Sequence, residues 1–512
     1  MNLTQEQQTI IEQATGPVSR IIAYAGTGKT HTLLAYAERH VKAMLYLAFN
    51  TSVKNEAFNK FPKEYVQCLT IHSLAYRAMR PKTEVKPYIS YFDVRRLMGC
   101  TLERAVNVVD TVEAYMRSAD REITAATCPF RYDIPEDLEI RMQVAASAKQ
   151  LYEAMRKGQF PITHGFYLKE YQLTNPTIRT KAIMLDEAQD TNPVMLDILL
   201  RQRCQMICVG DPYQQIYGFT GAVDAMDKLK GQDFFLTQSF RFGQSLADLA
   251  SMFLGMFYDL PKPLVGLPSV QTEVAGGEMP MPFTYIFRTN SGLFDAAVDY
   301  TNMGRKIALT GGTGRVQDFL EELNMLWFIF ANRPEQCSNP LFKAFNGWSG
   351  LRAWAKARED STLENRMDIV EKYGLRLPEV ISRVRANVVP DSQAHVLLVT
   401  AHRAKGMQWD RVRLADDFMY MTDEQGEPLK LAKQRVKGDA IFYEIDSNEA
   451  HLVYVAMTRA VRQLRVCKPF VDLVQRKPNE VLRRIREARA AAEAAQDPVV
   501  AGDFGEEDDD NE

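Results

Sequence analysis

Apolar residues along the chain form short continuous runs that alternate with helical patterns, in two separate blocks. The runs of the first block are RIIAY (20–24), AMLYLAF (43–49), KAIMLDE (181–187) and QMICVGD (205–211). Those of the second block are FTYIFRT (283–289), KIALT (306–310), AHVLLVT (394–400) and LRVC (464–467). Continuous apolar strands separated by helices are typical of parallel sheets that are covered on both faces. The pattern predicts an α/β fold with two parallel sheets.

A long helical and charged segment interrupts each block. Insertions that leave from strand ends are where an enzyme carries parts that handle its substrate. We therefore expect two lobes, each with a mainly helical insertion, and a terminal segment. Their bounds are 1–80 with 172–234 (first lobe), 81–171 (its insertion), 235–312 with 393–480 (second lobe), 313–392 (its insertion) and 481–512 (a basic helix and an acidic disordered tail).

The charged residues are unevenly distributed. Residues 501–512 (AGDFGEEDDDNE) hold seven of the 65 acidic residues and no basic one, so the rest of the chain, with 62 Lys and Arg, is mildly basic. Such a tail either keeps a protein soluble or binds a protein partner. The polar start MNLTQEQQTI does not resemble a signal peptide, and the apolar stretch LNMLWFIFA (323–331) is too short to span a bilayer. Because the seven cysteines also lack metal-ligand spacing, we expect a cytoplasmic protein with reduced thiols and no membrane span.

The sequence AYAGTGKT (23–30) follows the first apolar run and has the end of a phosphate-binding P-loop. Gly26 and Gly28 allow backbone N–H groups to surround a phosphate, and the start of the following helix adds its dipole. Lys29 would reach the β- and γ-phosphates, and the Thr30 hydroxyl would bind Mg²⁺. The pattern G-x-x-x-x-G-K-[ST] has glycine where Ala23 stands, so a plain glycine turn is the alternative. The P-loop alone leaves kinases, GTPases and motor ATPases open.

A second candidate motif, IMLDEAQD, places Asp186 and Glu187 directly after a buried strand. In an ATPase the aspartate holds Mg²⁺ and the glutamate polarises the attacking water. A lone Asp-Glu pair at the end of a strand is more often a surface turn or a helix cap. Since this pair follows a P-loop earlier in the chain, we interpret it as catalytic.

Further motifs resemble those of superfamily 1 helicases of the UvrD/Rep type, in the order of that family. They are VGDPYQQIYGFTGA (209–222), LTQSFRFG (236–243), VTAHRAKGMQWD (399–410) and YVAMTRA (454–460), preceded by a Q-motif-like LTQEQQTI (3–10) and an early DNA-contact motif, TIHSLAY (70–76). The resemblance implies two RecA-like lobes with ATP and Mg²⁺ between them. Alanine often replaces the first P-loop glycine in this family, so Ala23 fits it.

Within the superfamily, the segments AFNTSVKNEA (48–57) and TAHRAKGMQWD (400–410) are most similar to the F-box DNA helicases. The Q motif begins at Leu3, so we expect no F-box before it and predict a minimal prokaryotic or viral relative.

The resemblance also implies roles in nucleotide binding and hydrolysis. Gln7 matches the glutamine that reads adenine, and Phe240 the aromatic residue that stacks on it. Gln214 matches a γ-phosphate sensor, and Arg241 and Arg459 match two arginines that stabilise the charge of the transition state from the second lobe. The predicted catalytic set is Lys29, Glu187, Gln214, Arg241 and Arg459; the metal ligands are Thr30 and Asp186; and the remaining nucleotide contacts are Gln7, Ala25, Gly26, Thr27, Gly28, His31, Phe240 and Gln408. Relatives usually have glutamate where Gln408 stands, so the selectivity for the nucleotide is expected to loosen.

Other positions match residues along a single-stranded DNA path. The aromatic members would stack on bases, at roughly 1–3 kcal/mol each and without sequence preference. They are Phe49, Tyr217 and Phe219, and the polar members, which touch the backbone, are Thr70, His72, Arg288, Asn290, Thr400 and His402. Thr220 stands where relatives often have arginine, so one cationic contact is expected to be missing.

We therefore predict an ATP-dependent single-stranded DNA translocase and helicase that moves 3′ to 5′ and acts in replication, repair or recombination. Its DNA would be a single strand or a tailed duplex. One alternative is a translocase that strips proteins from DNA and unwinds little. Others are a nucleotide-gated DNA-binding module without hydrolysis and, with less support, a P-loop kinase for small molecules.

Overall fold

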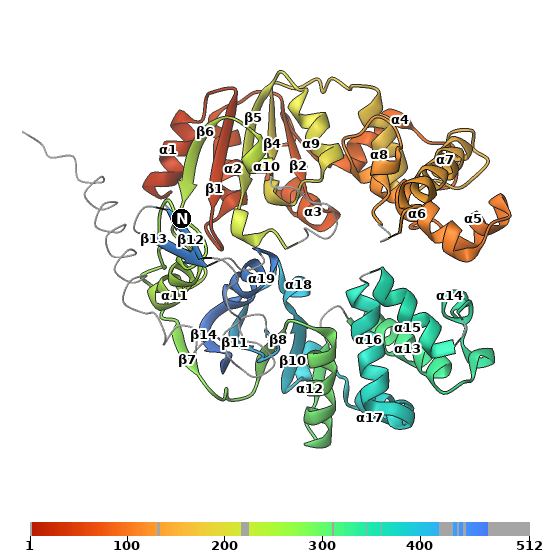
Figure 1. Cartoon of the computed structure of the whole chain (residues 1–512). Coiled ribbons are helices and arrows are strands. Elements are labelled where there is room, and N and C mark those ends of the chain that lie inside the picture. Colours follow the sequence, from red (N-terminus) through yellow and green to blue (C-terminus); the bar gives the residue numbers. More distant parts are fainter. Residues whose placement is uncertain are drawn as a thin grey trace, which may run out of the picture.

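The computed structural model describes residues 3–130, 134–216, 225–309, 312–345, 347–358, 360–418, 434–437, 440–443, 447–468 and 470. Two six-stranded sheets form the centres of two lobes, and every strand pair described within them is parallel (Figure 1). The predicted fold class, α/β with two RecA-like lobes, is confirmed. The terminal segment expected at 481–512 lies outside the described residues.

The first sheet has the strand order β3-β2-β4-β5-β1-β6. Its strands are β1 (Val18–Ala23), β2 (Met44–Ala48), β3 (Val66–Thr70), β4 (Ala182–Leu185), β5 (Gln205–Gly210) and β6 (Gln232–Leu236). Its helices are α1 (Gln5–Gln13), α2 (Lys29–Arg39), α3 (Thr51–Lys60), α9 (Pro193–Leu200) and α10 (Ala225–Lys228). Every residue of β2 and β4 is buried, which explains their continuous apolar runs. The sequence pattern missed β3 and β6, the two edge strands, which carry exposed polar residues.

The second sheet has the strand order β7-β14-β11-β8-β10-β9. Its strands are β7 (Glu273–Gly276), β8 (Phe283–Phe287), β9 (Ile307–Leu309), β10 (Val396–Thr400), β11 (Trp409–Leu414) and β14 (Ala460–Val466). Its helices are α11 (Gln244–Gly255), α12 (Asn290–Asn302), α18 (Ala401–Ala404) and α19 (Ser447–Met457), and a separate antiparallel pair joins β12 (Gln434–Lys437) to β13 (Ala440–Tyr443). The pattern missed the edge strand β7 and the interior strand β11.

Helices make up most of the segments that interrupt the two lobes. Beside the first lobe lie α4 (Ile71–Met79), α5 (Tyr91–Met98), α6 (Leu102–Arg117), α7 (Asp137–Arg156) and α8 (His164–Leu173). Beside the second lie α13 (Gly312–Phe330), α14 (Pro340–Lys343), α15 (Gly347–Ala357), α16 (Ser361–Tyr373) and α17 (Leu377–Asn387). Among the described residues, no helix is both long and apolar enough to cross a membrane.

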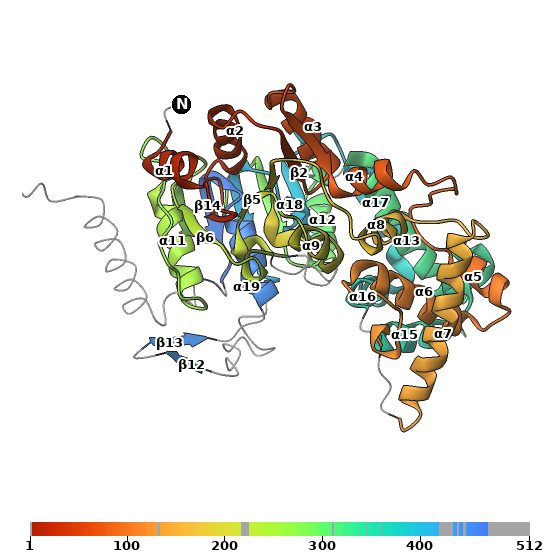
Figure 2. The same cartoon turned by 90° about the horizontal axis from the view of Figure 1, so that it is seen from above.

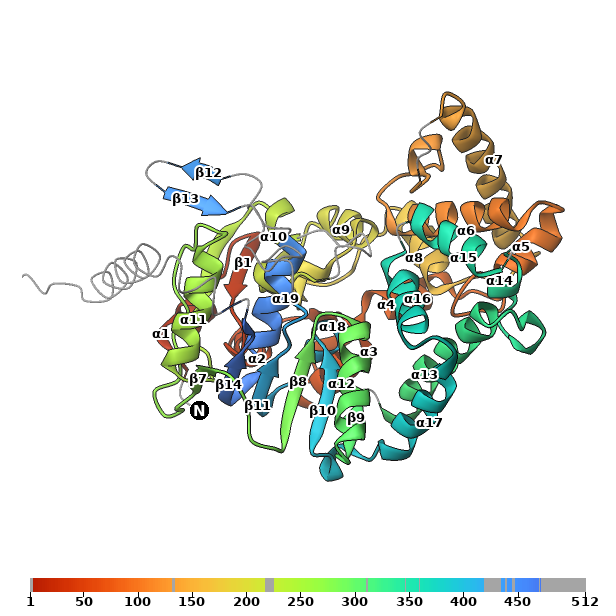
Figure 3. The same cartoon turned by 60° about the horizontal axis from the view of Figure 1, so that its bottom comes forward.

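The two helical insertions lie side by side on the same flank of the molecule (Figures 2 and 3). Arg358, just after α15, donates a hydrogen bond from Nη1 to Oδ1 of Asn107 on α6, at 3.1 Å, and forms an ion pair with Asp110. The two lobes also share apolar packing, because Tyr24 from the end of β1 is buried in the core of the second lobe. Its hydroxyl donates to the backbone oxygen of Lys262 at 2.5 Å.

Candidate nucleotide site between the lobes

The P-loop turn joins β1 to α2 at the carboxyl edge of the first sheet. Gly28 precedes α2 with φ +76° and provides no side chain to cap the helix, so the first turn of α2 can present its N–H groups to an anion. Gly26 has φ +78°, and a Cβ atom there would lie 2.6 Å from Oγ of Ser239 and 2.9 Å from Cβ of Arg241. Both the left-handed backbone and the close approach of the next segment therefore require glycine at position 26.

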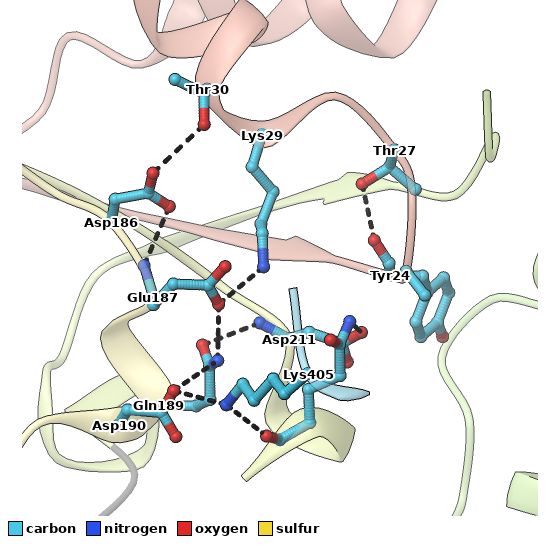
Figure 4. Close-up of polar contacts among 12 residues, drawn as sticks. Tyr24, Thr27, Lys29, Thr30, Asp186, Glu187, Gln189, Asp190, Asp211 and Lys405 are labelled. Atoms are coloured by element: carbon cyan, nitrogen blue, oxygen red, sulfur yellow. Dashed lines mark hydrogen bonds and ion pairs between the residues drawn. The ribbon is translucent and has the colours of Figure 1, made fainter. Parts of the chain in front are cut away.

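Carboxylates at the end of β4 face the P-loop lysine (Figure 4). Nζ of Lys29 lies 2.8 Å from Oε2 of Glu187, and the Thr30 hydroxyl donates to Oδ2 of Asp186 at 3.3 Å. Burial disfavours the charged form of Glu187, but Lys29 and Lys405 outweigh burial and lower its pKa to about 2. Burial, followed by the charge of Glu187, raises the pKa of Asp186. The buried carboxylates of Asp186 and Glu187 need cations nearby, and Lys29 and Lys405 supply them.

The Thr30 hydroxyl and the Asp186 carboxylate are oxygen ligands of the kind that Mg²⁺ prefers. Mg²⁺ usually takes one or two protein oxygens and completes its shell with water and phosphate oxygens. Within the described ranges, no group of three His, Cys, Asp or Glu side chains could hold a metal ion by itself. The pair therefore fits a Mg²⁺ ion that arrives with a nucleotide.

Two arginines of the second lobe reach the same site. Arg241 donates from Nε to Oε1 of Gln408 at 2.9 Å and from Nη1 to the backbone oxygen of Thr458 at 2.8 Å. Arg459 is fully buried and donates from Nη2 to Oε1 of Gln214 at 3.3 Å. Burial, followed by the nearby Arg241 charge, lowers the pKa of Arg459 to about 9, so it remains a cation at neutral pH.

A pocket of about 300 Å³ lies between these groups. Its walls come from both lobes. The first lobe contributes Gly26, Thr27, Gly28, Lys29, Thr30, His31, Phe49, Asn50, Val53, Glu187, Asp190 and Gln214, and the second contributes Arg241, Lys405, Gly406 and Arg459. The structure thus brings together in one pocket all five residues of the predicted catalytic set.

Lys405 and Asp190 are pocket residues that sequence reasoning missed. Nζ of Lys405, from the second lobe, forms an ion pair with Asp190 of the first and donates to the backbone oxygen of Gln214 at 2.7 Å. Oδ1 of Asp190 is buried and has no hydrogen-bond partner among the described residues. Burial raises the pKa of Asp190 to about 6, although Lys405 opposes the shift. Asp190 lies in the motif DEAQD and Lys405 in the motif TAHRAKG, so their place in these motifs was the only sequence evidence for a role at the site.

The two residues predicted to hold adenine meet beside Gly28. A Cβ atom on Gly28 would lie 3.5 Å from Nε2 of Gln7 and 3.5 Å from the ring of Phe240. Gln7 caps α1, since its Oε1 accepts from the backbone N–H of Thr4 at 3.0 Å, and its Nε2 donates to Oγ1 of Thr32 at 3.1 Å. Gln7 is therefore held by hydrogen bonds at both ends of its amide, and the amide lies against the first turn of α2.

Two members of the P-loop have bonds that point away from a phosphate. The Thr27 hydroxyl donates to the backbone oxygen of Tyr24 at 2.8 Å. The N–H of Ala25 donates to the hydroxyl of Tyr454, from the second lobe, at 3.1 Å. Thr27 lines the pocket, and these contacts give both residues a role in holding the loop.

The first-lobe candidates for DNA contact follow the carboxyl ends of β2 and β3. Phe49 is 43% exposed, and Thr70 caps α4 through a bond from the N–H of Ser73 to its hydroxyl at 3.1 Å. His72 lies edge-on to Tyr167, with 6.4 Å between ring centroids. Burial, followed by the proximity of His164, lowers the pKa of His72 to about 4, so His72 is neutral at pH 7.

The second-lobe candidates follow the carboxyl ends of β8 and β10, and α18 faces α3 of the first lobe (Figures 1 and 3). Arg288 donates from Nε to Glu449 at 2.8 Å and is half-buried, while Asn290 is the first residue of α12. Thr400 is buried at the end of β10, and burial lowers the pKa of His402 to about 4. The remaining candidates, Tyr217 and Phe219, and the departure at Thr220 lie outside the described residues. DNA contact by all these residues stays a prediction.

Two family models match the chain, one in each lobe. Residues 148–232 match the UvrD/REP helicase N-terminal domain, and residues 360–468 match the UvrD-like helicase C-terminal domain. The two matched segments are thus similar to domains of UvrD-like helicases. The resemblance inferred from the ordered motifs is confirmed.

Similar proteins include F-box and UvrD-type helicases. The chain is 31% identical over 515 residues to F-box DNA helicase 1 of Gallus gallus, covering 93% of this chain and 50% of that protein. It is 28% identical to F-box DNA helicase protein 1 of Schizosaccharomyces pombe, covering 90% and 57%. It is 23% identical to the ATP-dependent DNA helicase UvrD2 of Mycobacterium tuberculosis, covering 90% and 77%. The chain thus spans only about half the length of the two F-box helicases.

Proposed function

We propose that this UvrD-like chain is an ATP-dependent single-stranded DNA translocase and DNA helicase. One observation carries the proposal: a single pocket has the P-loop and Glu187 on one wall and Lys405, Arg241 and Arg459 on the other. The two walls belong to different lobes. A site completed across two lobes ties ATP turnover to their relative movement, which is what a motor requires.

Several side chains at the site have a defined role in the proposed reaction. The P-loop N–H groups and Lys29 bind the phosphates, and Thr30 with Asp186 would hold Mg²⁺, which neutralises charge on the phosphoryl oxygens. Glu187 orients the attacking water. Arg241 and Arg459 stabilise the charge that spreads over the phosphoryl oxygens in the transition state.

The proposed nucleic acid is single-stranded DNA, including the tail of a duplex. The described candidates lie at or just after the carboxyl ends of β2, β3, β8 and β10, which belong to both lobes. A DNA strand that contacts them would therefore be displaced when the lobes move relative to each other. The three relatives compared above are named as DNA helicases, which supports DNA as the substrate. The 3′ to 5′ polarity and the role in replication, repair or recombination rest on the family resemblance.

Two alternatives have distinct outcomes in a direct assay. Unwinding of 3′-tailed and 5′-tailed duplexes is measured beside the displacement of a recombinase filament from single-stranded DNA. A helicase unwinds the 3′-tailed duplex in an ATP-dependent reaction, whereas a protein-stripping translocase clears the filament and unwinds little. A nucleotide-gated binding module does neither, and that result would overturn the proposal. The cytoplasmic location and the prokaryotic or viral origin stay predictions from the sequence.

A further inference from the structure

Tyr454, on α19 of the second lobe, places its hydroxyl between two parts of the nucleotide site of the first lobe. The side chain is fully buried. Its oxygen accepts a hydrogen bond from the N–H of Ala25 in the P-loop at 3.1 Å. Its proton is donated to Oδ2 of Asp211, just after β5, also at 3.1 Å. One hydroxyl therefore bonds both the P-loop backbone and a buried carboxylate of the opposite lobe.

Asp211 connects this hydroxyl to the rest of the site. Its Oδ2 also accepts from Nε2 of Gln214 at 2.6 Å, and its N–H donates to Oε1 of Gln189 at 3.1 Å. Gln189 in turn donates from Nε2 to Oε2 of Glu187 at 2.7 Å, the oxygen that also bonds Lys29 (Figure 4). A continuous chain of hydrogen bonds thus runs from the second lobe to the proposed catalytic glutamate.

We propose that Tyr454 is a positioning residue that couples lobe closure to the P-loop and to Glu187. Hydrogen bonds weaken steeply with distance, so about half an ångström of further separation between the lobes would break both bonds of the hydroxyl. The N–H of Ala25 and the carboxylate of Asp211 would then lose a buried partner, and the side chains that depend on Asp211 would lose their orientation. This inference rests on the proposed function, because it requires turnover that responds to DNA.

The test is Tyr454→Phe, which keeps the ring and removes the hydroxyl. We expect the DNA-stimulated kcat for ATP to fall about 10-fold to 100-fold, the usual range for partners that orient ligands from outside a metal site. The basal rate without DNA falls less, so the ratio of stimulated to basal turnover decreases, while the KM for ATP changes little. The matched control is Tyr36→Phe, which removes the hydroxyl of another fully buried tyrosine. Its acceptors, the backbone oxygen of Ala14 at 3.0 Å and Oε1 of Gln205 at 3.3 Å, both lie within the first lobe.

The ratio of stimulated to basal turnover stays valid if the variant is partly unfolded, because both rates scale with the amount of folded protein. A second measurement is the double variant Tyr454→Phe/Asp211→Asn. Since the hydroxyl acts through Asp211, the effects on the ratio should be less than additive.

A ratio for Tyr454→Phe equal to that of Tyr36→Phe would overturn the inference, as would strict additivity in the double variant. Failure of the proposed function is a separate outcome, since the wild-type protein itself would then show no stimulation by DNA.

Discussion

Arg459 and Gln214 lie 245 residues apart in the chain, and Nη2 of the arginine donates to Oε1 of the glutamine at 3.3 Å. The bond crosses the boundary between the lobes. Gln214 also bonds Asp211, so the arginine joins the same polar network as Tyr454. The contact can persist only while the lobes are closed, which links the predicted γ-phosphate sensor to the predicted arginine.

Arg459→Ala should leave ATP binding largely intact and lower turnover by about 10³-fold or more, the range found for arginines that stabilise phosphoryl transfer. Binding of a fluorescent ATP analogue and steady-state phosphate release measure the two effects. The control is Arg462→Ala, since Arg462 lies three residues further along the chain, on β14, but its side chain is 73% exposed. Arg459→Lys, which keeps the charge but not the forked geometry, tests whether any loss reflects packing alone. Unchanged turnover in Arg459→Ala would make Arg459 a structural residue.

Lys29→Ala should abolish ATP turnover while single-stranded DNA binding survives. The ion pair between Lys29 and Glu187 is centred on the P-loop, and the DNA candidates lie on other elements. Phosphate release and fluorescence anisotropy with a labelled oligonucleotide measure the two properties. Lys60→Ala, which removes a half-exposed lysine paired with Glu56, is the control. Near-normal DNA-stimulated turnover in Lys29→Ala would refute the nucleotide site.

Lys405→Met should lower both stability and turnover, because it leaves the buried carboxylate of Asp190 without its cation. Breaking a buried ion pair costs about 3–5 kcal/mol. Adding Asp190→Asn should restore much of the lost melting temperature, since the uncompensated charge is gone, but not the turnover, since the pocket still lacks Lys405. Thermal melting and phosphate release are compared for the single and double variants. A double variant that melts no higher than Lys405→Met would contradict the pairing.

The buried carboxyl of Asp211 should make stability depend on pH. Burial raises its pKa to about 6 in the folded protein, against an ordinary value of 3.8. Between these values the folded state binds more protons than the unfolded state, so the Asp211 term lowers the free energy of unfolding as pH rises. The melting temperature of Asp211→Asn relative to wild type should therefore increase between pH 4 and pH 6 and level off above. A constant difference across that range would show that Asp211 has an ordinary pKa.

Removal of residues 501–512 should raise the affinity for single-stranded DNA at low salt, and the difference should shrink at high salt. Seven carboxylates tethered to the chain would compete with DNA phosphates for its basic residues, and salt would screen that competition. Affinity is measured by anisotropy at several salt concentrations. A scrambled tail of the same composition is the control and should behave as the wild type. Equal affinity of the shortened and full chains at every salt concentration would leave only a role in partner binding or solubility.

The apolar pattern predicted the interior strands β2 and β4 because both of their faces are buried. It missed β11, although that strand also lies inside its sheet. Polar residues alternate along β11, and the Arg413 guanidinium covers the ring of Tyr285 and pairs with Glu278. Such a strand satisfies its charges through neighbours that are distant in sequence, so a run of apolar residues cannot reveal it.

The P-loop and the Asp-Glu pair were predictable because each is a local motif at a strand end. The roles of Lys405 and Tyr454 were not predictable, because their partners lie 215 and 243 residues away in the chain. Both residues lie in recognisable sequence motifs, but the packing of the lobes decides which carboxylate each one contacts. The ion pair between Arg288 and Glu449 has the same origin.

The most informative single measurement is the rate of phosphate release from ATP, with and without single-stranded DNA. In the proposed motor, ATP is hydrolysed in a pocket completed by both lobes, and DNA that spans the lobes promotes their closure. We therefore expect a low rate for the protein alone and a saturable increase when a single-stranded oligonucleotide is added, with no increase in Lys29→Ala. A wild-type rate that is the same with and without DNA would refute this coupling.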